Sequence, residues 1–343
     1  MKVLVTGASG FLGGHLAEAA VAAGDDVRAL LRPGAALSLD TGVDQIEPVP
    51  GDLSDPESLD VATRGVEVVY HSAARVTDHG SRAQFFGTNV AGTARLLAAA
   101  RANGVRRFVF VSSPSAVMDG RDQVRIDESV PYPARYLNLY SESKAAAERL
   151  VLAANSPGFT TCALRPRGIW GPRDWHGFMP RMIAKLRAGR LPDLSGGRVV
   201  HASLCHVTNA VRACRLAAGS DDVGGRAYFV ADAEVSDVWA LTAQVARLFD
   251  ATPPTRRVPP VLRDALVGAV ETVWRIPYLR DRHSPPLSRY SIALLTRTGT
   301  YDTSAATRDF GYSPVIGQPD GLRQLRAWAD SVGGVDAFTR YVR

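Results

Sequence analysis

The sequence has few cysteines and lacks a long uncharged apolar run. Its three cysteines, Cys162, Cys205 and Cys214, form no C-x-x-C pair, so their spacing fits neither a zinc site nor a disulfide framework. We expect no metal, and thiols that act as small core or pocket residues. The long apolar stretches carry charges, which predicts no membrane-spanning helix. The start also lacks the apolar segment and cleavage site of a signal peptide, so a cytoplasmic location is expected.

The charge pattern gives little support for nucleic acid as a partner. The formal net charge is +6, but the arginines are dispersed rather than gathered into a stripe. Anionic cofactors and substrates explain such a basic surface at least as well. Apolar residues make up 46% of the chain and charged residues 22%, as in an ordinary soluble protein. A small-molecule substrate is therefore expected.

The first half of the chain alternates short apolar runs with helical stretches. Strands are expected at positions 2–6, 27–31, 46–49, 67–71 and 108–112, followed by a sixth at 161–165. Helical stretches, including 11–23 and 93–103, separate them. This βαβα alternation is typical of a parallel sheet with helices on both faces. Right-handed crossovers then predict an α/β fold with a doubly wound Rossmann sheet.

The pattern loosens after position 160, where loops rich in proline and glycine begin. We predict a dinucleotide-binding domain over residues 1–165 and a smaller, interleaved substrate lobe over residues 166–343, with some segments returning to the Rossmann core. Within that lobe, the apolar stretch 261–279 carries Arg263, Asp264, Glu271 and Arg275. It predicts a helix packed on the lobe or at an oligomer interface. A helix lying on a membrane surface is the alternative.

A glycine-rich loop, TGASGFLG from Thr6, follows the first expected strand. Gly7 permits a tight turn, Gly10 lets the backbone approach a pyrophosphate, and Gly13 permits close packing of helix on strand. The helix N-terminus offers unpaired N–H groups to phosphates. The spacing differs from the G-x-G-x-x-G of ordinary Rossmann sites, but the place at the first βα junction indicates dinucleotide binding. The expected contacts are Gly7, Ser9, Gly10, Phe11, Leu12 and Gly13.

The residues after the second and third strands bear on which nucleotide binds. The second strand ends at Leu31-Arg32 without the carboxylate that would bind an adenosine ribose. Arg32 can pair with a 2′-phosphate, which favours NADP(H) over NAD(H); alternatively it stacks on adenine or faces solvent. Asp52, beside Leu53, can accept a hydrogen bond from the adenine amino group or can cap a helix or turn.

The most specific chemical signal is YSESK, from Tyr140 to Lys144, at the start of a helical run. Positions i and i+4 share a helix face, and a nearby ammonium is expected to lower the pKa of the phenol toward a useful value. A hydroxyl at the end of the fifth strand can hold the substrate oxygen. Ser113 is the first candidate, with Ser112 and Ser115 as alternatives.

Together these motifs resemble the extended short-chain dehydrogenase/reductase superfamily. The most similar branch contains 3β-hydroxysteroid dehydrogenases, sterol-4α-carboxylate 3-dehydrogenases and 2-alkyl-3-oxoalkanoate reductases. The resemblance covers nearly the whole chain. It is carried by TGASGFLG, HSAA from His71, NVAGT from Asn89, SSPSAV from Ser112, YSESKAAAERLVLAAN from Tyr140, LRPRGIWGPRD from Leu164 and RDFGYSP from Arg308.

The resemblance implies that Tyr140 donates or accepts a proton and that Lys144 binds the nicotinamide ribose. It also implies positions at or near the nucleotide for Ala73, Ala74, Asn89, Ser112, Pro166 and Arg167. A homodimer through the helices around Asn89 and Tyr140 is expected on the same basis. The run SLCHVTN at 203–209 departs from the aspartate–x–threonine–aromatic pattern of the family, which leaves the substrate open.

The predicted function is NAD(P)-dependent interconversion of a ketone and a secondary alcohol. The resemblance implies a sizeable apolar substrate, sterol-like or β-keto acid-like. If a carboxylate lies beside the ketone, Arg167, Arg173 or another arginine of the smaller lobe is expected to bind it. Peripheral membrane contact remains compatible with the sequence. A nucleotide-sugar epimerase or dehydratase with the same Tyr/Lys pair is one alternative, and a non-catalytic dinucleotide-binding module is another.

Overall fold

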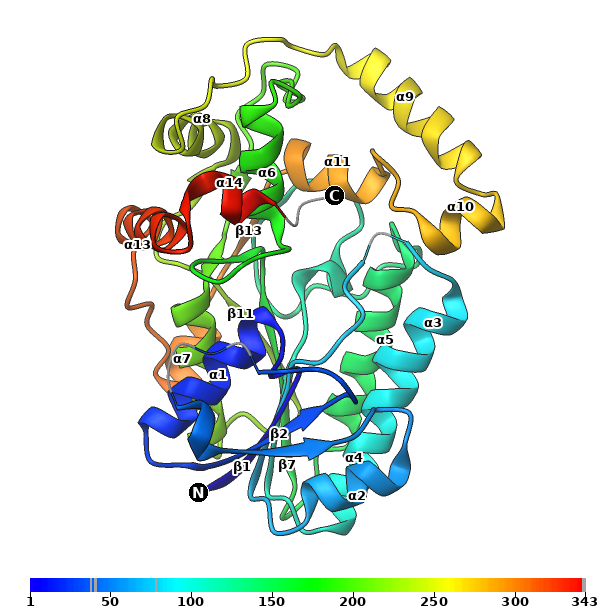
Figure 1. Cartoon of the computed structure of the whole chain (residues 1–343). Helices are drawn as coiled ribbons and strands as arrows, with labels where there is room; N and C mark the ends of the chain where they lie inside the picture. The colour runs from blue at the N-terminus through cyan, green and yellow to red at the C-terminus, as the bar shows by residue number, and fades with distance from the viewer. Residues whose placement is uncertain (38, 40–41, 78, 341–343) are drawn as a thin grey trace.

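A parallel sheet forms the lower part of the molecule in Figure 1. The computed structural model describes residues 1–37, 39, 42–77 and 79–340, and within them this sheet has seven strands in the order β11-β7-β5-β4-β1-β2-β3. All of its neighbouring pairs are parallel. The doubly wound Rossmann fold predicted from the βαβα alternation is therefore confirmed.

Six of these strands lie within a residue or so of their predicted positions, and one was not predicted. The unpredicted strand is β11, whose short run RAYFV pairs with β7 at the edge of the sheet. It returns to the sheet from the second half of the chain, far beyond the regular alternation. The strands are β1 (Lys2–Thr6), β2 (Asp26–Leu31), β3 (Ile46–Pro50), β4 (Val68–His71), β5 (Arg107–Val111), β7 (Thr160–Pro166) and β11 (Arg226–Val230).

Helices cover both faces of the sheet, and each face has its own apolar cluster. One face packs against α1 (Phe11–Ala22), α7 (Val207–Gly219) and α12 (Ser304–Phe310). The other packs against α2 (Pro56–Thr63), α4 (Thr93–Ala102) and α5 (Leu139–Ala153). Strands buried on both sides explain the nearly continuous apolar runs of the sequence.

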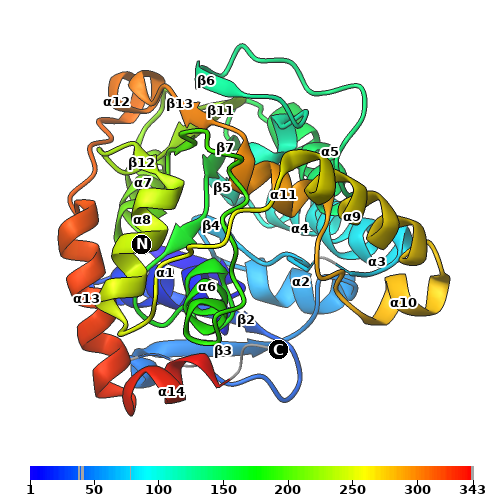
Figure 2. The ribbon, with the colours of Figure 1, turned by 90° about the horizontal axis from the view of Figure 1, so that it is seen from above.

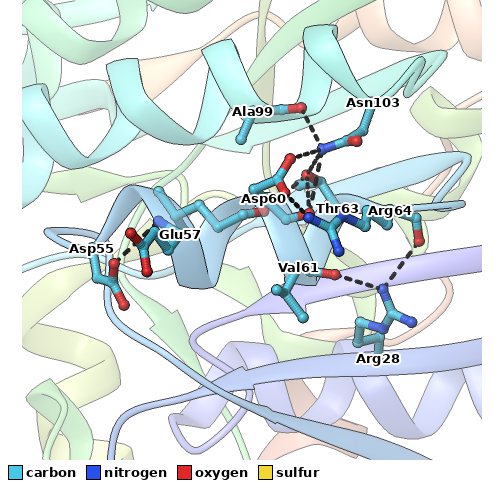
Figure 3. A network of polar contacts seen from close by, with 10 residues as sticks. Arg28, Asp55, Glu57, Asp60, Val61, Thr63, Arg64, Ala99 and Asn103 are labelled. Atoms are coloured by element: carbon cyan, nitrogen blue, oxygen red, sulfur yellow. Dashed lines mark hydrogen bonds and ion pairs between the residues drawn. The ribbon is translucent and has the colours of Figure 1, made fainter.

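Polar contacts fix α2 to the sheet and to its neighbouring helix (Figure 3). The Arg28 guanidinium, from β2, donates to the carbonyls of Val61 and Arg64 at the end of α2, each at 3.1 Å. Asn103, just after α4, donates to the Asp60 carboxylate at 2.9 Å. Arg28 thus satisfies carbonyls that a helix C-terminus leaves unpaired.

The second half of the chain builds most of the upper lobe. A mixed sheet has the order β12-β9-β13-β6 and a pair joins β10 to β8. Helices of this lobe surround the buried Trp170. The elements are β6 (Gln123–Ile126), β8 (Ile169–Trp170), β9 (His201–Ala202), β10 (Cys205–His206), β12 (Ser236–Asp237), β13 (Gly299–Tyr301), α6 (Phe178–Arg187), α8 (Val238–Leu248), α13 (Gln318–Ser331) and α14 (Gly334–Thr339).

Residues 256–296 form what we call the outer arm, which contains α9 (Pro260–Val273), α10 (Pro277–Arg282) and α11 (Arg289–Thr296). In Figures 1 and 2, α9 and α10 lie at the periphery of the upper lobe. The single helix predicted over 261–279 is wrong. It ends at Val273 and a new one begins at Pro277, because proline cannot continue a helix. Among the described residues, no helix has the length and apolar character needed to span a bilayer.

Candidate active site

The glycine loop lies between β1 and α1, and its glycines are needed for different reasons. Gly7 has a φ of +76°, and a Cβ there would lie 2.8 Å from the backbone nitrogen of Ala73. A Cβ on Gly13 would collide with the Gly7 carbonyl. Gly10, the exposed N-cap of α1, would place a Cβ no closer than 3.2 Å to a protein atom. The protein packing thus requires Gly7 and Gly13, whereas a Cβ on Gly10 would press on one protein atom, the Gly7 carbonyl oxygen, at an exposed helix N-terminus of the kind that binds a pyrophosphate.

The other predicted members of the loop are divided between surface and core. Ser9 is exposed and Phe11 partly buried, whereas Leu12 is buried in the cluster beneath α1. Leu12 therefore contributes its backbone, rather than its side chain, to the rim of the loop. Side chains that turn away into the core leave the backbone N–H groups of the loop available to bind an anion.

Arg32 and Asp52 lie together beyond the ends of β2 and β3. Arg32 is exposed, and its charge helps to lower the pKa of Asp52. The larger cause of that lowered pKa is the Ser54 hydroxyl, which donates to Asp52 Oδ1 at 2.6 Å, and the Ser54 backbone N–H donates to the same oxygen at 2.8 Å. Asp52 therefore acts as a turn cap through one oxygen. Its neighbour Leu53 is buried.

The loop after β4 is held in place by Asn89. This side chain accepts from Arg75 N at 2.7 Å and donates to Ser143 Oγ at 2.9 Å. Asn89 lies in the π-helical turn η2 (Gly87–Gly92) between α3 (Arg82–Phe86) and α4. It connects the segment containing the partly buried Ala73 and Ala74 to the catalytic helix candidate α5. The structure thus gives Asn89 a bracing role near the loop.

His71 ends β4 as a fully buried, neutral imidazole. Its Nδ1 lies 2.7 Å from Thr6 Oγ1, and its Nε2 lies 2.9 Å from Thr93 Oγ1. Burial, with a smaller contribution from the Lys144 charge, lowers the pKa of His71 to about 3. The ring joins β1, β4 and α4 next to the glycine loop, a role that HSAA did not reveal from the sequence.

Tyr140 faces the serines that follow β5. Burial raises the pKa of the Tyr140 phenol. The hydroxyls of Ser113 and Ser115 interact with the phenol and oppose this rise, but their effect is smaller. Ser113 Oγ also accepts from Ser115 N at 3.2 Å. Ser112 Oγ and Ser115 Oγ are buried and meet no hydrogen-bond partner of normal geometry among the described residues. Buried hydroxyls of this kind require a partner.

Lys144 lies one helical turn after Tyr140 and is buried. Its Nζ donates to the Val111 carbonyl at 2.6 Å and lies 4.1 Å from the centroid of the Phe110 ring. Burial lowers the pKa of Lys144 to about 7, and the Glu148 carboxylate opposes that shift. The expected lowering of the Tyr140 pKa by Lys144 is not seen here: desolvation raises the pKa of the phenol, and the interactions that oppose this rise come from Ser113 and Ser115.

The arginines expected to meet a substrate carboxylate are held by the protein itself. Arg167 donates to the carbonyl of Gly299 at 2.6 Å and to that of Leu294 at 3.3 Å. Arg173 forms an ion pair with Glu18 on α1. Arg167 thus joins two segments of the upper lobe, whereas Arg173 joins that lobe to the sheet domain, and a carboxylate contact by either guanidinium stays a prediction. Pro166 is buried at the end of β7, beside Arg167.

The sequence does not reveal Tyr290, which lies near Tyr140, or Asp232, which contacts the SLCHVTN run. Tyr290, on α11, has its ring centroid 6.5 Å from that of Tyr140 in an edge-to-face arrangement. Asp232 accepts from His206 N at 2.6 Å and from Asn209 Nδ2 at 2.7 Å. Asp232 therefore supplies a carboxylate next to the SLCHVTN run, although it comes from a distant part of the sequence. Neither residue lies in a motif, so only long-range packing identifies it.

The fold and the site define a class: a dinucleotide-binding oxidoreductase of the short-chain dehydrogenase/reductase type. Residues 4–260 match the model of the 3-beta hydroxysteroid dehydrogenase/isomerase family. The chain belongs to that family. It is an NAD(P)-dependent oxidoreductase acting on CH–OH groups, as the relatives below support.

Three curated relatives illustrate the range of the family. The chain is 35% identical to a 2-alkyl-3-oxoalkanoate reductase of Shewanella oneidensis, covering 94% of this chain and 85% of the relative. It is 36% identical to a 4-hydroxy-2-methyl-3-oxo-4-farnesyl-3,4-dihydroquinoline-1-oxide ketoreductase of Stigmatella aurantiaca, with 95% and 96% covered. It is 32% identical to a 3 beta-hydroxysteroid dehydrogenase/Delta 5-->4-isomerase of Mycobacterium tuberculosis, with 92% and 86% covered.

Solved structures agree with the fold. MoeE5 in complex with UDP-glucuronic acid and NAD has a TM-score of 0.74 at 26% identity, with 96% of this chain and 99% of that chain covered. A UDP-glucose 4-epimerase of Thermotoga maritima has a TM-score of 0.75 at 18% identity, with 97% and 99% covered. The second likeness concerns the fold alone.

Proposed function

We propose that the chain reduces a ketone on a sizeable apolar substrate, or oxidises the corresponding secondary alcohol, with Tyr140 as the acid or base. The observation that carries this proposal is the anchoring of α5 on the end of β5: Lys144, one turn after Tyr140, donates to the Val111 carbonyl at 2.6 Å, and the Tyr140 phenol interacts with the hydroxyls of Ser113 and Ser115. The substrate class is suggested by relatives named as reductases of 2-alkyl-3-oxoalkanoates and as 3β-hydroxysteroid dehydrogenases. A β-keto acid or a sterol is therefore the first substrate class to test.

The protein residues supply proton transfer and orientation. In the reductive direction, the Tyr140 hydroxyl gives its proton to the carbonyl oxygen as that oxygen becomes an alkoxide. A hydroxyl of Ser113, or of the alternatives Ser112 and Ser115, donates to the same oxygen and stabilises its developing charge. The raised pKa of Tyr140 keeps the phenol protonated before the reaction. The Lys144 ammonium, fixed on the Val111 carbonyl, stabilises the phenolate that remains.

A nicotinamide dinucleotide supplies or takes up the hydride when it is bound. The residues fit this group: Gly10 is exposed at the N-terminus of α1, and Arg32 is exposed beyond the end of β2. We propose that Gly7, Ser9, Gly10, Phe11, Leu12 and Gly13 hold the pyrophosphate. NADP(H) is favoured, because the guanidinium of Arg32 matches a 2′-phosphate. Asp52, whose Oδ1 also holds its own turn, is the proposed acceptor for the adenine amino group.

The remaining nucleotide contacts are proposed at the ends of neighbouring strands. Leu53, Ala73 and Ala74 would line the adenosine side, while Lys144, Ser112, Pro166 and Arg167 would surround the nicotinamide ribose. Arg167 would act there through its backbone, since its side chain holds Gly299. A cytoplasmic homodimer through the outer faces of η2 and α5 completes the proposal. Leu150, on α5, is 39% exposed and would lie in that interface.

The decisive experiment follows NADPH and NADH consumption with long-chain β-keto acids, sterols and small ketones. We expect stoichiometric turnover with a member of the first two groups. Tyr140→Phe should reduce kcat by about 10²- to 10⁴-fold while leaving nucleotide binding intact. Undiminished turnover in this variant would remove Tyr140 from the mechanism. Conversion of nucleotide sugars without net NAD(P)H consumption would instead establish the epimerase or dehydratase alternative, which a fold shared with MoeE5 in complex with UDP-glucuronic acid and NAD makes worth testing.

A further inference from the structure

Two tyrosine rings from distant segments meet beside the candidate active site. Tyr140 is the second residue of α5, and Tyr290 is the second residue of α11 in the outer arm. Their ring centroids are 6.5 Å apart and their ring planes meet at 66°, an edge-to-face contact. Both residues are half-buried, and neither belongs to an apolar cluster among the described residues. The pair therefore lines an accessible surface, where aromatic rings are typical of ligand sites.

Helix α11 lies over the edge of the sheet where the candidate site forms. Arg167, which follows β7, donates to the Leu294 carbonyl of α11 at 3.3 Å. Tyr140, which contacts the same helix through Tyr290, interacts with the serines that follow β5. Because β5 and β7 are neighbouring strands, these two contacts place α11 across their carboxyl ends, above the sheet in Figure 1. Ligands of doubly wound sheets bind at this edge.

The backbone on both sides of Tyr290 is fixed by hydrogen bonds. Ser288 Oγ accepts from Ser291 N at 3.1 Å, and Ser291 Oγ accepts from Ser288 N at 2.9 Å. Arg289 N donates to the Glu271 carboxylate of α9 at 3.0 Å, and the Arg289 guanidinium pairs with the same carboxylate at 2.9 Å. The start of α11 is therefore held in place before any ligand arrives, so a contact with the Tyr290 ring costs little ordering of the protein.

We infer that Tyr290 is a specificity-determining residue whose ring binds the apolar part of the substrate next to the reacting carbonyl. The inference rests on the proposed function, because it takes the Tyr140 hydroxyl as the group that meets the carbonyl oxygen. A ketone held there has the substituents of its carbonyl carbon beside the adjoining ring, which is that of Tyr290. An aromatic wall suits an alkyl chain or fused rings, since it removes their surface from water. A small ketone extends over little of this ring and gains little from it.

A purely structural role for Tyr290 would be to hold Tyr140 in place, but other contacts already do so. The Asn138 side chain caps α5 by accepting from Ser141 N at 2.8 Å. Lys144, one turn later, donates to the Val111 carbonyl at 2.6 Å. A mere support would also affect every substrate alike, whereas an apolar wall distinguishes substrates by the size of their apolar part. The two roles therefore make different predictions.

The test compares NADPH-dependent reduction of two matched pairs of ketones by the full-length protein. The pairs are β-decalone with butanone, and β-ketododecanoate with acetoacetate, whose members share the reacting group and differ in apolar size. We expect Tyr290→Ala to lower the ratio of kcat/KM between the larger and the smaller member about tenfold, through a higher KM for the larger one. Tyr290→Phe keeps the ring and should restore most of this ratio.

The matched control is Tyr278→Ala, which removes an exposed tyrosine from α10 of the same arm and should leave the ratio at its parental value. Equal thermal unfolding temperatures would show that the variants are folded. A second measurement needs no turnover: calorimetric titration of the two larger ketones into the protein with NADP⁺, which cannot reduce them. Tyr290→Ala should weaken this binding about tenfold, as expected for the loss of a large apolar contact.

The two measurements separate failure of the inference from failure of the proposed function. An unchanged ratio in Tyr290→Ala, or an equal loss for both members of each pair, would overturn the inference and leave ketone reduction standing. Faster reduction of the larger members would also overturn it, because the ring would then be an obstacle. If the parent reduces no ketone, the proposed function fails, and calorimetry still decides on Tyr290. Equal binding to parent and variant, or no binding to either, would overturn the inference in that case.

Discussion

The parallel sheet and the outer arm bury their side chains to very different degrees. Val3, Leu4 and Val5 of β1 are fully inaccessible to solvent, with helices on both sides. In α9, by contrast, only Arg263 and Val267 are buried. The groups proposed to perform chemistry extend from the tightly packed region, where a small displacement is costly. The arm contributes Tyr290 and an exposed surface, which can change without disturbing the sheet.

The largest expected effect concerns the glycine loop, where packing and ligand binding can be separated. Gly13→Ala should lower the free energy of unfolding by about 3 kcal/mol or more, because the new methyl group would collide with the Gly7 carbonyl. Gly10→Ala should change it by less than about 1 kcal/mol but weaken dinucleotide binding. Chemical denaturation and nucleotide titration measure the two effects. Unfolding at the same denaturant concentration in both variants would show that the loop is not tightly packed.

These differences also explain what the sequence could predict. The strands of the sheet are buried on both faces, so their apolar runs are visible in the sequence, and the i, i+4 spacing of Tyr140 and Lys144 follows from helical geometry. Strand β11 and Tyr290 join the structure from distant segments, and no local pattern marks them. The pKa direction of Tyr140 depends on burial, which spacing alone does not contain. Pro277, by contrast, marks in the sequence itself the point where α10 begins as a separate helix.

A second effect should appear in the acid stability of the sheet. The pKa of His71 is lowered from 6.5 to about 3, so the folded state holds the neutral ring while the unfolded chain takes up a proton near pH 6.5. His71 therefore contributes stability above pH 6.5 that is lost as the pH falls toward 3. His71→Asn should be about 1–3 kcal/mol less stable at pH 7 and should show a flatter decline over this range.

The measurement is urea unfolding of both proteins at several pH values between 7 and about 3, a range set by the unfolded and folded pKa values of the imidazole. The quantity of interest is the difference between the two stability curves, since carboxylates elsewhere contribute equally to both. A difference that stays constant with pH would contradict the neutral, hydrogen-bonded state of His71. Such a result would also remove one difference between the sheet and the arm, since His71 is buried in the sheet whereas His283 of the arm is exposed.

A smaller effect is expected at the edge of the nucleotide site, where side chains are exposed as they are in the arm. Arg32→Ala should weaken NADPH binding about tenfold, as expected for the loss of a charge-assisted hydrogen bond. NADH binding should change less than about twofold, because it has no 2′-phosphate to lose. Fluorescence titration with both nucleotides measures this ratio. Arg247→Ala, another exposed arginine, is the control, and equal losses for both nucleotides would contradict the proposed 2′-phosphate contact.

The last comparison uses the same substitution in the two regions. Val5→Ala removes two methyl groups from a site enclosed by β2, β4 and the helices of one face. Val267→Ala removes them from the small cluster under α9, whose other buried apolar members are Leu194 and Ile292. We expect losses of about 2–3 kcal/mol and about 1 kcal/mol respectively, because a thinly packed helix can shift to fill the space. Equal losses of unfolding free energy would mean that the arm is packed as firmly as the sheet. The exposed face of α9 would then not indicate loose packing on its buried face.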